Sequence, residues 1–339
     1  MKMSKFIKST LILLVGGFLT KVLGMLIKII TTRIIGTETL GLYMLIMPTF
    51  NLFITLAQGG LPISVSKIVS ENKKDNKKIV FSSIFISICT TFFLMILLIF
   101  ISPLIAKFLH NDSLSFPIMC IGLTLPFISL SGIIRGYFFG KENMFPHVLS
   151  NNFEQVVRII LNIIFLPLLS NYEPRVSVTF LILSNVISET TSIIILYFFL
   201  PRKIKVTKEM LKPEKIIIKD VLNISIPTTG SRIIGTIGYF LEPIVLTSFL
   251  LMNGYTTNYI TYEYGVLTGY VMPLLLLPSF FTMAISQATL PVISNGYANN
   301  KIPYVKKKIK QSLLLSFAIG LFFTIILMIF PEIFMKLIY

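Results

Sequence analysis

The sequence predicts an all-α fold, a polytopic bundle of transmembrane helices. Of its 339 residues, 54% are hydrophobic and only 13% are charged. The charged fraction is roughly half of the ~25% found in water-soluble domains. The apolar residues form stretches long enough to cross a bilayer core of about 30 Å, which takes about 20 helical residues. Together these features exclude a soluble enzyme, a disordered chain and a disulfide-stabilised scaffold.

Nine apolar stretches are long enough to be spans. They occupy residues 9–33, 41–66, 79–106, 114–138, 147–170, 177–200, 221–251, 262–295 and 311–330. The first stretch follows three lysines, but its apolar character continues to about Ile35 without a small-residue cleavage site, so we interpret it as an uncleaved span. We divide the chain into an N-terminal six-helix lobe (1–200), a basic cytoplasmic linker (201–219) and a partial C-terminal lobe of about three helices (220–339).

The distribution of Lys and Arg predicts the orientation in the membrane. With the N-terminus in the cytoplasm, 22 of the 30 Lys and Arg residues fall on the cytoplasmic side, four fall outside and four lie within spans. This bias is what the positive-inside rule describes. Cytoplasmic Lys and Arg also account for the net charge of +16. No basic segment is separate from the spans, which argues against a nucleic-acid-binding domain. We therefore predict a multi-pass protein of the cell membrane, with a cytoplasmic N-terminus and no nucleic-acid partner.

A short internal repeat relates the two lobes. Thr20–Gly24 in the first span matches Ser231–Gly235 in the seventh. In the second and eighth spans, Pro48–Phe50 matches Pro278–Phe280, and Ala57–Pro62 matches Ser286–Pro291. Both copies start on the same side of the membrane, an arrangement that places a substrate site between two lobes. Prolines in or near the spans are candidate hinges or kinks. The candidates are Pro48, Pro62, Pro227, Pro278 and Pro291.

Charged residues within the spans are the candidate site residues, because each costs about 2.5–3.5 kcal/mol at the bilayer centre. The cations are Lys21, Lys28, Arg158 and Arg232, and the acids are Glu154, Glu189 and Glu242. Lys21 and Arg232 are equivalent in the repeat, whereas Lys28 lies near enough to a span end to snorkel to water. Arg158 follows Glu154 by four residues, so the two can pair along one helix face.

This excess of cations predicts a polar cavity between the lobes that binds an anion such as a phosphate or pyrophosphate head group. The three acids are candidate partners of the arginines or sites for a coupling ion. We expect no metal site and no cofactor, because no His, Cys and acid cluster has metal-ligand spacing and no nucleotide-binding motif is present. Cys89 and Cys120 lie in apolar stretches, where we expect small core side chains and no disulfide.

Several segments resemble a known family. They are Gly17–Gly24, Arg33–Gly36, Gly41–Tyr43, Gly59–Lys67, Arg135–Gly140, Met144–Pro146, Glu154–Arg158, Tyr264–Pro273 and Leu277–Phe280. The pattern is similar to the stage V sporulation protein B group of polysaccharide transporters. That group lies in the multidrug/oligosaccharidyl-lipid/polysaccharide exporter superfamily, which also holds the lipid II flippases.

The resemblance implies two six-helix lobes around a V-shaped cavity. It also implies flipping of an undecaprenyl-pyrophosphate-linked glycan precursor through the cell membrane, for cell wall or spore cortex. Lys21, Lys28 and Arg232 are the positions that the resemblance assigns to the diphosphate. Two departures from the family pattern matter. Lysine replaces arginine at some cavity positions, which keeps the charge but loses bidentate phosphate geometry. The relatives also have more spans than this chain.

The smaller number of spans leaves two alternatives: a second chain completes the C-terminal lobe, or the chain is a truncated relative that does not transport. A rival of the same fold is a multidrug exporter coupled to H⁺ or Na⁺, which an acidic cavity around Glu154 and Glu242 would favour. A membrane enzyme is disfavoured, since His, Asp and Glu are scattered along the sequence.

Overall fold

The computed structural model describes residues 5–71, 73–201, 214–279 and 300–338, together with a few positions between 281 and 293. Helices are the regular secondary structure of these described residues, which confirms the predicted all-α class. Seven helical segments among them are long and apolar enough to cross a bilayer. The chain is therefore a multi-pass membrane protein.

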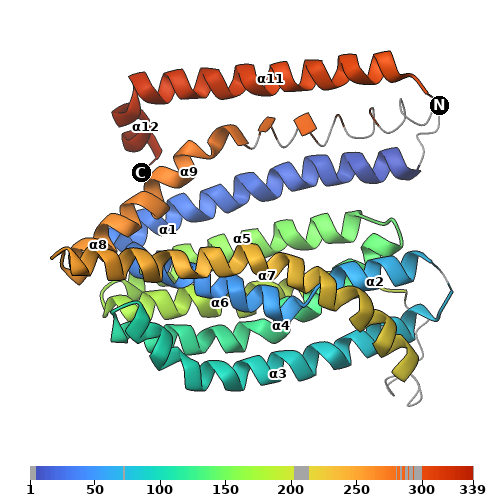
Figure 1. Cartoon of the computed structure of the whole chain (residues 1–339), viewed down its shortest axis with the longest axis horizontal. Coiled ribbons are helices and arrows are strands. Elements are labelled where there is room, and N and C mark those ends of the chain that lie inside the picture. Colours follow the sequence, from blue (N-terminus) through green and yellow to red (C-terminus); the bar gives the residue numbers. More distant parts are fainter. Residues whose placement is uncertain are drawn as a thin grey trace.

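The N-terminal part is a bundle of long helices that run side by side (Figure 1). Its elements are α1 (Lys5–Gln58), α2 (Leu61–Ser70), α3 (Asn76–Phe108), the 3₁₀ turn η1 (Asp112–Leu114), α4 (Ser115–Gly140), α5 (Phe145–Leu169) and α6 (Pro174–Phe198). Leu45, Leu98, Ile121 and Leu181 are core residues from α1, α3, α4 and α6. Helix α5 packs against both α1 and α6.

The first two predicted spans are joined in α1. Gly36 interrupts the helical conformation with φ 71° and ψ 173°. A positive φ of this size is open to glycine at little cost and is unfavourable for other residues. The break falls between the predicted spans 9–33 and 41–66, so the two stretches form one kinked element.

The remaining elements are α7 (Lys215–Met252), α8 (Thr257–Gly265), the π-helix η2 (Val266–Val271), α9 (Met272–Leu275), α11 (Ile302–Ile329) and α12 (Pro331–Ile338). Helix α7 begins within the range predicted as a linker, of which residues 202–213 lie outside the described part of the chain. The predicted span 262–295 begins with α8, η2 and α9, and most of its later residues are also outside the described part. Helix α11 matches the last predicted span (Figure 1).

The candidate hinge prolines occupy different structural positions. Pro48 lies inside α1 and Pro227 inside α7, where each removes a backbone hydrogen bond. Pro62 instead stands in the first turn of α2, a position where proline starts a helix. Pro278 lies just beyond α9. Pro291 lies outside the described residues.

Glycines bring α8 and η2 against the second half of α1. A Cβ added to Gly265 would lie 2.7 Å from the Cα of Gly41. A Cβ on Gly41 would collide with the backbone carbonyl of Thr261, and one on Gly269 with the side chain of Leu40. Because a larger residue has no room at these positions, the glycines set how closely the C-terminal part approaches α1.

The start of α7 is attached to the N-terminal part by apolar and ionic contacts. Ile217 and Val221 of α7 are buried in a cluster with residues of α2, α3 and α4. Lys74 pairs with Asp220, and Lys78 Nζ lies 3.0 Å from Glu214 Oε2. These contacts lie far along α7 from the glycine contact of α8. The two parts of the chain are therefore in contact both at the start of α7 and at α8.

The outer faces of the helices are apolar. On α3, Phe92, Phe93 and Phe100 are 59%, 63% and 76% exposed, and on α11 Phe317 is 69% exposed. In water an apolar surface of this extent would be unusual. It is the expected surface of a helix in contact with lipid tails.

We expect Gly41→Ala to destabilise the protein by about 1–3 kcal/mol, because the new methyl group would collide with backbone that cannot move without shifting α8. Gly17→Ala is the matched control, since a Cβ there would meet no described atom within 4 Å. Thermal unfolding, monitored by labelling of the buried Cys120 with a thiol-reactive dye in a chain with Cys89 replaced by serine, measures the difference. Equal melting temperatures for the two variants would contradict the packing described for α8.

Candidate functional site

A polar cavity of about 250 Å³ lies between α1, α5, α6 and the C-terminal part. It is lined by Gly24, Ile27, Lys28, Thr31, Thr32, Leu40, Tyr43, Met44, Met47, Arg158, Asn162, Leu181, Ser184, Tyr239 and Thr268. The charged members of this set are Lys28 and Arg158, and none of the lining residues is acidic. The wall therefore carries hydrogen-bond donors and positive charge, which suits an anion.

Lys28 connects α1 to the C-terminal part across this cavity. Its Nζ donates to the carbonyl oxygen of Thr268, 3.0 Å away. Thr268 belongs to the π-helix η2, and its hydroxyl donates to the carbonyl of Tyr264 at 2.5 Å. π-Helical turns are rare and occur frequently at functional sites. The ammonium group uses one of its three donors on this carbonyl, so it has further donors for a ligand.

Polar contacts hold α5 in place beside α1. The amide of Asn162 donates to the hydroxyl of Thr31 at 2.9 Å, and the hydroxyl of Thr20 donates to the side-chain oxygen of Asn152 at 2.8 Å. Two such bonds fix how α5 is rotated and shifted along α1. They consequently fix where Arg158, which lies on α5, enters the cavity wall.

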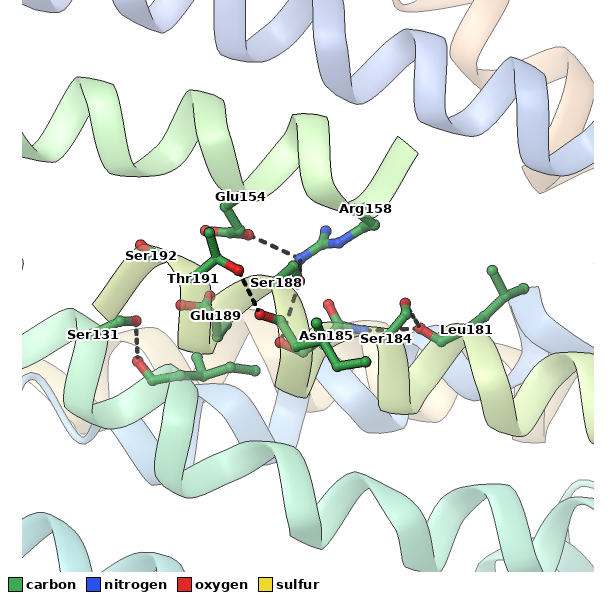
Figure 2. A network of polar contacts seen from close by, with 12 residues as sticks. Ser131, Glu154, Arg158, Leu181, Ser184, Asn185, Ser188, Glu189, Thr191 and Ser192 are labelled. Carbon is green, nitrogen blue, oxygen red and sulfur yellow. Dashed lines mark hydrogen bonds and ion pairs between the residues drawn. The ribbon is translucent and has the colours of Figure 1, made fainter. Parts of the chain in front are cut away.

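Arg158 is part of a buried network of two arginines and two glutamates. Figure 2 shows Arg158 with Glu154, and Glu189 beside them. Its Nη2 lies 2.9 Å from Glu154 Oε1 and donates to Ser188 Oγ at 3.3 Å. Nη2 of Arg135, on α4, lies 2.7 Å from Glu154 Oε2 and 3.4 Å from Glu189 Oε2. The same Nη2 also donates to Ser192 Oγ at 2.7 Å.

The network joins three helices through charges that are largely removed from solvent. The side chains of Glu154 and Glu189 are each 8% exposed, that of Arg135 is 16% exposed and that of Arg158 is 22% exposed. Removing one partner from such a network leaves an uncompensated buried charge, which costs about 3–5 kcal/mol. The Nε atoms of both arginines have no hydrogen-bond partner in the described part of the chain. Arg158 thus keeps an unused donor in the protein interior.

The structure places the predicted cations in two groups. Lys28 and Arg158 lie together in the cavity wall. Lys21 and Arg232 are exposed, on α1 and α7, and are not among the residues that line this cavity. That any of the four binds substrate stays a prediction.

The predicted acids separate in the same way. Glu154 pairs with Arg158, as the spacing of four residues predicts, and Glu189 pairs with Arg135. Glu242 is exposed on α7. In the described residues no group of three or more His, Cys, Asp or Glu side chains has a geometry that could hold a metal ion.

Arg135 is the residue of this site that sequence reasoning missed. The charge count places Arg135 among the 22 cytoplasmic cations, at the end of the predicted span 114–138, and the structure corrects that placement. Arg135 lies inside α4 and is paired with acids of both α5 and α6. The signal in the sequence was weak, because nothing in the sequence brings residue 135 close to residues 154 and 189.

The sequence model of a family described as polysaccharide biosynthesis protein matches residues 6–296. The chain belongs to this family. Stage V sporulation protein B of Bacillus subtilis (strain 168) is 36% identical to it, over 98% of this chain and 67% of that protein. Lipid II flippase MurJ of the same organism is 22% identical, over 91% of this chain and 61% of that protein.

Solved structures show the same fold for this family member. The inward-facing conformation of a multidrug resistance MATE family transporter of the MOP superfamily matches with a TM-score of 0.71 and 16% sequence identity. The match covers 92% of this chain and 70% of that chain. The fold is therefore that of the MOP superfamily transporters.

We expect Glu154→Leu to lower the free energy of unfolding by about 3 kcal/mol, because both arginines would lose a carboxylate in a buried site. Glu332→Leu is the control, since Glu332 forms an exposed pair with Lys336 at 3.9 Å. An exposed pair of this kind contributes little to stability. Thermal unfolding of the two purified variants measures the difference, and similar melting temperatures would show that the network does not stabilise the bundle.

Proposed function

We propose that this chain is a flippase-type transporter that moves the diphosphate head group of an undecaprenyl-pyrophosphate-linked glycan precursor across the cytoplasmic membrane. The observation that carries the proposal is that Lys28 and Arg158 both line one cavity, and that no acidic residue lines it. A diphosphate is a compact, strongly charged group, which such a wall can bind through charge-assisted hydrogen bonds. Membership in the polysaccharide biosynthesis protein family supports the same substrate class.

The cavity is too small for a whole glycan, so we assign it to the diphosphate. The glycan would lie along the adjoining surfaces of α1 and α7, beside Lys21 and Arg232. Added Cβ atoms at Gly17, Gly24, Gly230 and Gly235 on these helices would meet no described atom within 4 Å. The polyprenyl tail would remain in lipid throughout, which avoids moving a charge through hydrocarbon.

We further propose that the N-terminus is cytoplasmic and that the cavity is loaded from the cytoplasmic side. The positive-inside rule supports this orientation. The glycine contact between α1 and α8 then lies toward the outer end, where it blocks release. Transport requires that contact to separate while the cytoplasmic ends of the helices approach one another, the rocking motion expected of two lobes around a fixed site.

We also propose that transport is coupled to H⁺ or Na⁺, with the acids near the cavity as candidate sites for the ion.

The second candidate function is export of cationic drugs, coupled to an ion. One solved transporter with this fold is described as a multidrug resistance protein, and Glu242 is an exposed acid on α7. The charges of the cavity wall argue against it, because Lys28 would repel a cation, and Glu154, the acid beside the wall, is already paired with Arg158. The two functions therefore differ in the sign of charge that the cavity accepts.

Lys28→Glu should reduce translocation of a fluorescent polyprenyl diphosphate in proteoliposomes by about tenfold or more, because it reverses a charge that faces the diphosphate. Lys28→Arg should keep most of the activity, and Lys107→Glu, an exposed lysine at the end of α3, is the matched charge-reversal control. If Lys28→Glu leaves translocation of the diphosphate intact and increases transport of a cationic dye, the drug-exporter function is correct instead.

A further inference from the structure

Arg135 is a third half-buried cation near the cavity, but it is not among the residues that line the cavity. It lies on α4 and contacts the two glutamates of the network at 2.7 and 3.4 Å. Arg135 is paired with two carboxylates, and one of them, Glu154, is shared with the cavity arginine.

The sharing is specific at the level of atoms. Glu154 Oε2 lies 2.7 Å from Arg135 Nη2, whereas its other oxygen, Oε1, lies 2.9 Å from Arg158 Nη2. If Arg158 turned toward a ligand, Oε1 would lose its partner while Oε2 kept Arg135. The carboxylate would then remain paired, and the large cost of an isolated buried charge would be avoided.

The charges of the network balance only when Arg135 is counted. Two guanidinium groups face two carboxylates, and the serine partners of the network, Ser131, Ser188 and Ser192, are neutral. Without Arg135, Glu154 and Glu189 together would place two negative charges beside the single positive charge of Arg158. The cavity wall at Arg158 would then repel an anion, although Arg158 itself would still be present.

We propose that Arg135 is a positioning residue for anion binding: it balances Glu154 and Glu189 so that Arg158 can bind the substrate's diphosphate. This inference rests on the proposed function. The ligand chemistry is a diphosphate group, whether it is attached to a polyprenyl lipid or free as inorganic pyrophosphate. Arg135 acts on this ligand through Glu154 and does not touch it.

The test is calorimetric titration of the purified full chain with farnesyl pyrophosphate, with inorganic pyrophosphate and farnesol as separate probes. We expect Arg135→Gln to raise the Kd for farnesyl pyrophosphate about tenfold or more, since it exposes Arg158 to an unbalanced negative charge. The double variant R135Q/E189Q restores the balance and should return to within about threefold of the unaltered chain. R135K, which keeps the charge, should also bind almost normally.

Ser192→Ala is the matched control, because it removes a hydrogen bond of Arg135 at 2.7 Å without changing any charge. A merely structural role predicts that R135Q/E189Q binds at least as poorly as R135Q, and this result would overturn the inference. If R135Q does not fold, the test depends on R135K and R135Q/E189Q. If these two variants melt cooperatively and neither binds the diphosphate, the inference is also overturned. Normal binding by R135Q would also overturn it.

Lys28→Gln distinguishes this inference from the proposed function. If Lys28→Gln weakens binding of farnesyl pyrophosphate and R135Q does not, the cavity binds diphosphate and only the role of Arg135 is wrong. If the unaltered chain binds none of the diphosphates, or binds farnesol equally well, the proposed function fails and the inference fails with it. If inorganic pyrophosphate binds, and the variants change its Kd in the same order as they change the Kd for farnesyl pyrophosphate, the protein recognises the diphosphate group rather than the lipid.

Discussion

The packing of the N-terminal helices and the position of the cavity depend on two carboxylates that are buried in the interior of the N-terminal bundle. Glu154 and Glu189 are almost fully buried, and a charge in such a place is tolerated only when it is paired and hydrogen-bonded. The two arginines that pair with them come from α4 and α5, and Glu189 comes from α6. Three helices must therefore keep their relative positions, and in that arrangement Arg158 lies at the edge of the cavity.

The second requirement is close packing between the two parts of the chain. The glycines of α1 and α8 allow the backbones to approach closely, and this approach brings the π-helix η2 to the cavity. Lys28 then reaches the carbonyl of Thr268. The cavity wall thus combines one cation fixed by the ion network with another that contacts the C-terminal part. A movement of the C-terminal part would change the partners of Lys28 but leave those of Arg158 in place.

Much of this fold follows from the sequence. Hydropathy predicts the all-α class and most span positions, because a bilayer requires long apolar helices. The pairing of Glu154 with Arg158 also follows, since helix geometry fixes residues four apart. Contacts among Arg135, Glu154 and Glu189 could not be predicted, because they depend on how three separate helices pack. The backbone break at Gly36 and the π-helix were likewise unpredictable from apolar periodicity, since both depend on local conformation rather than on hydropathy.

The most direct measurement of the central claim is the reactivity of a cysteine placed in the cavity wall. Tyr239 lines the cavity and is 42% exposed, so Tyr239→Cys, in a chain with Cys89 and Cys120 replaced by serine, reports on access by water and anions. Ile99→Cys on the apolar face of α3 is the control, since Ile99 is 48% exposed but lies on the face we assign to lipid. In proteoliposomes we expect an anionic methanethiosulfonate to label position 239 and not position 99, and inorganic pyrophosphate to slow that labelling. Labelling at 239 that is absent, or that pyrophosphate does not slow, would contradict a water-filled cavity that binds diphosphate.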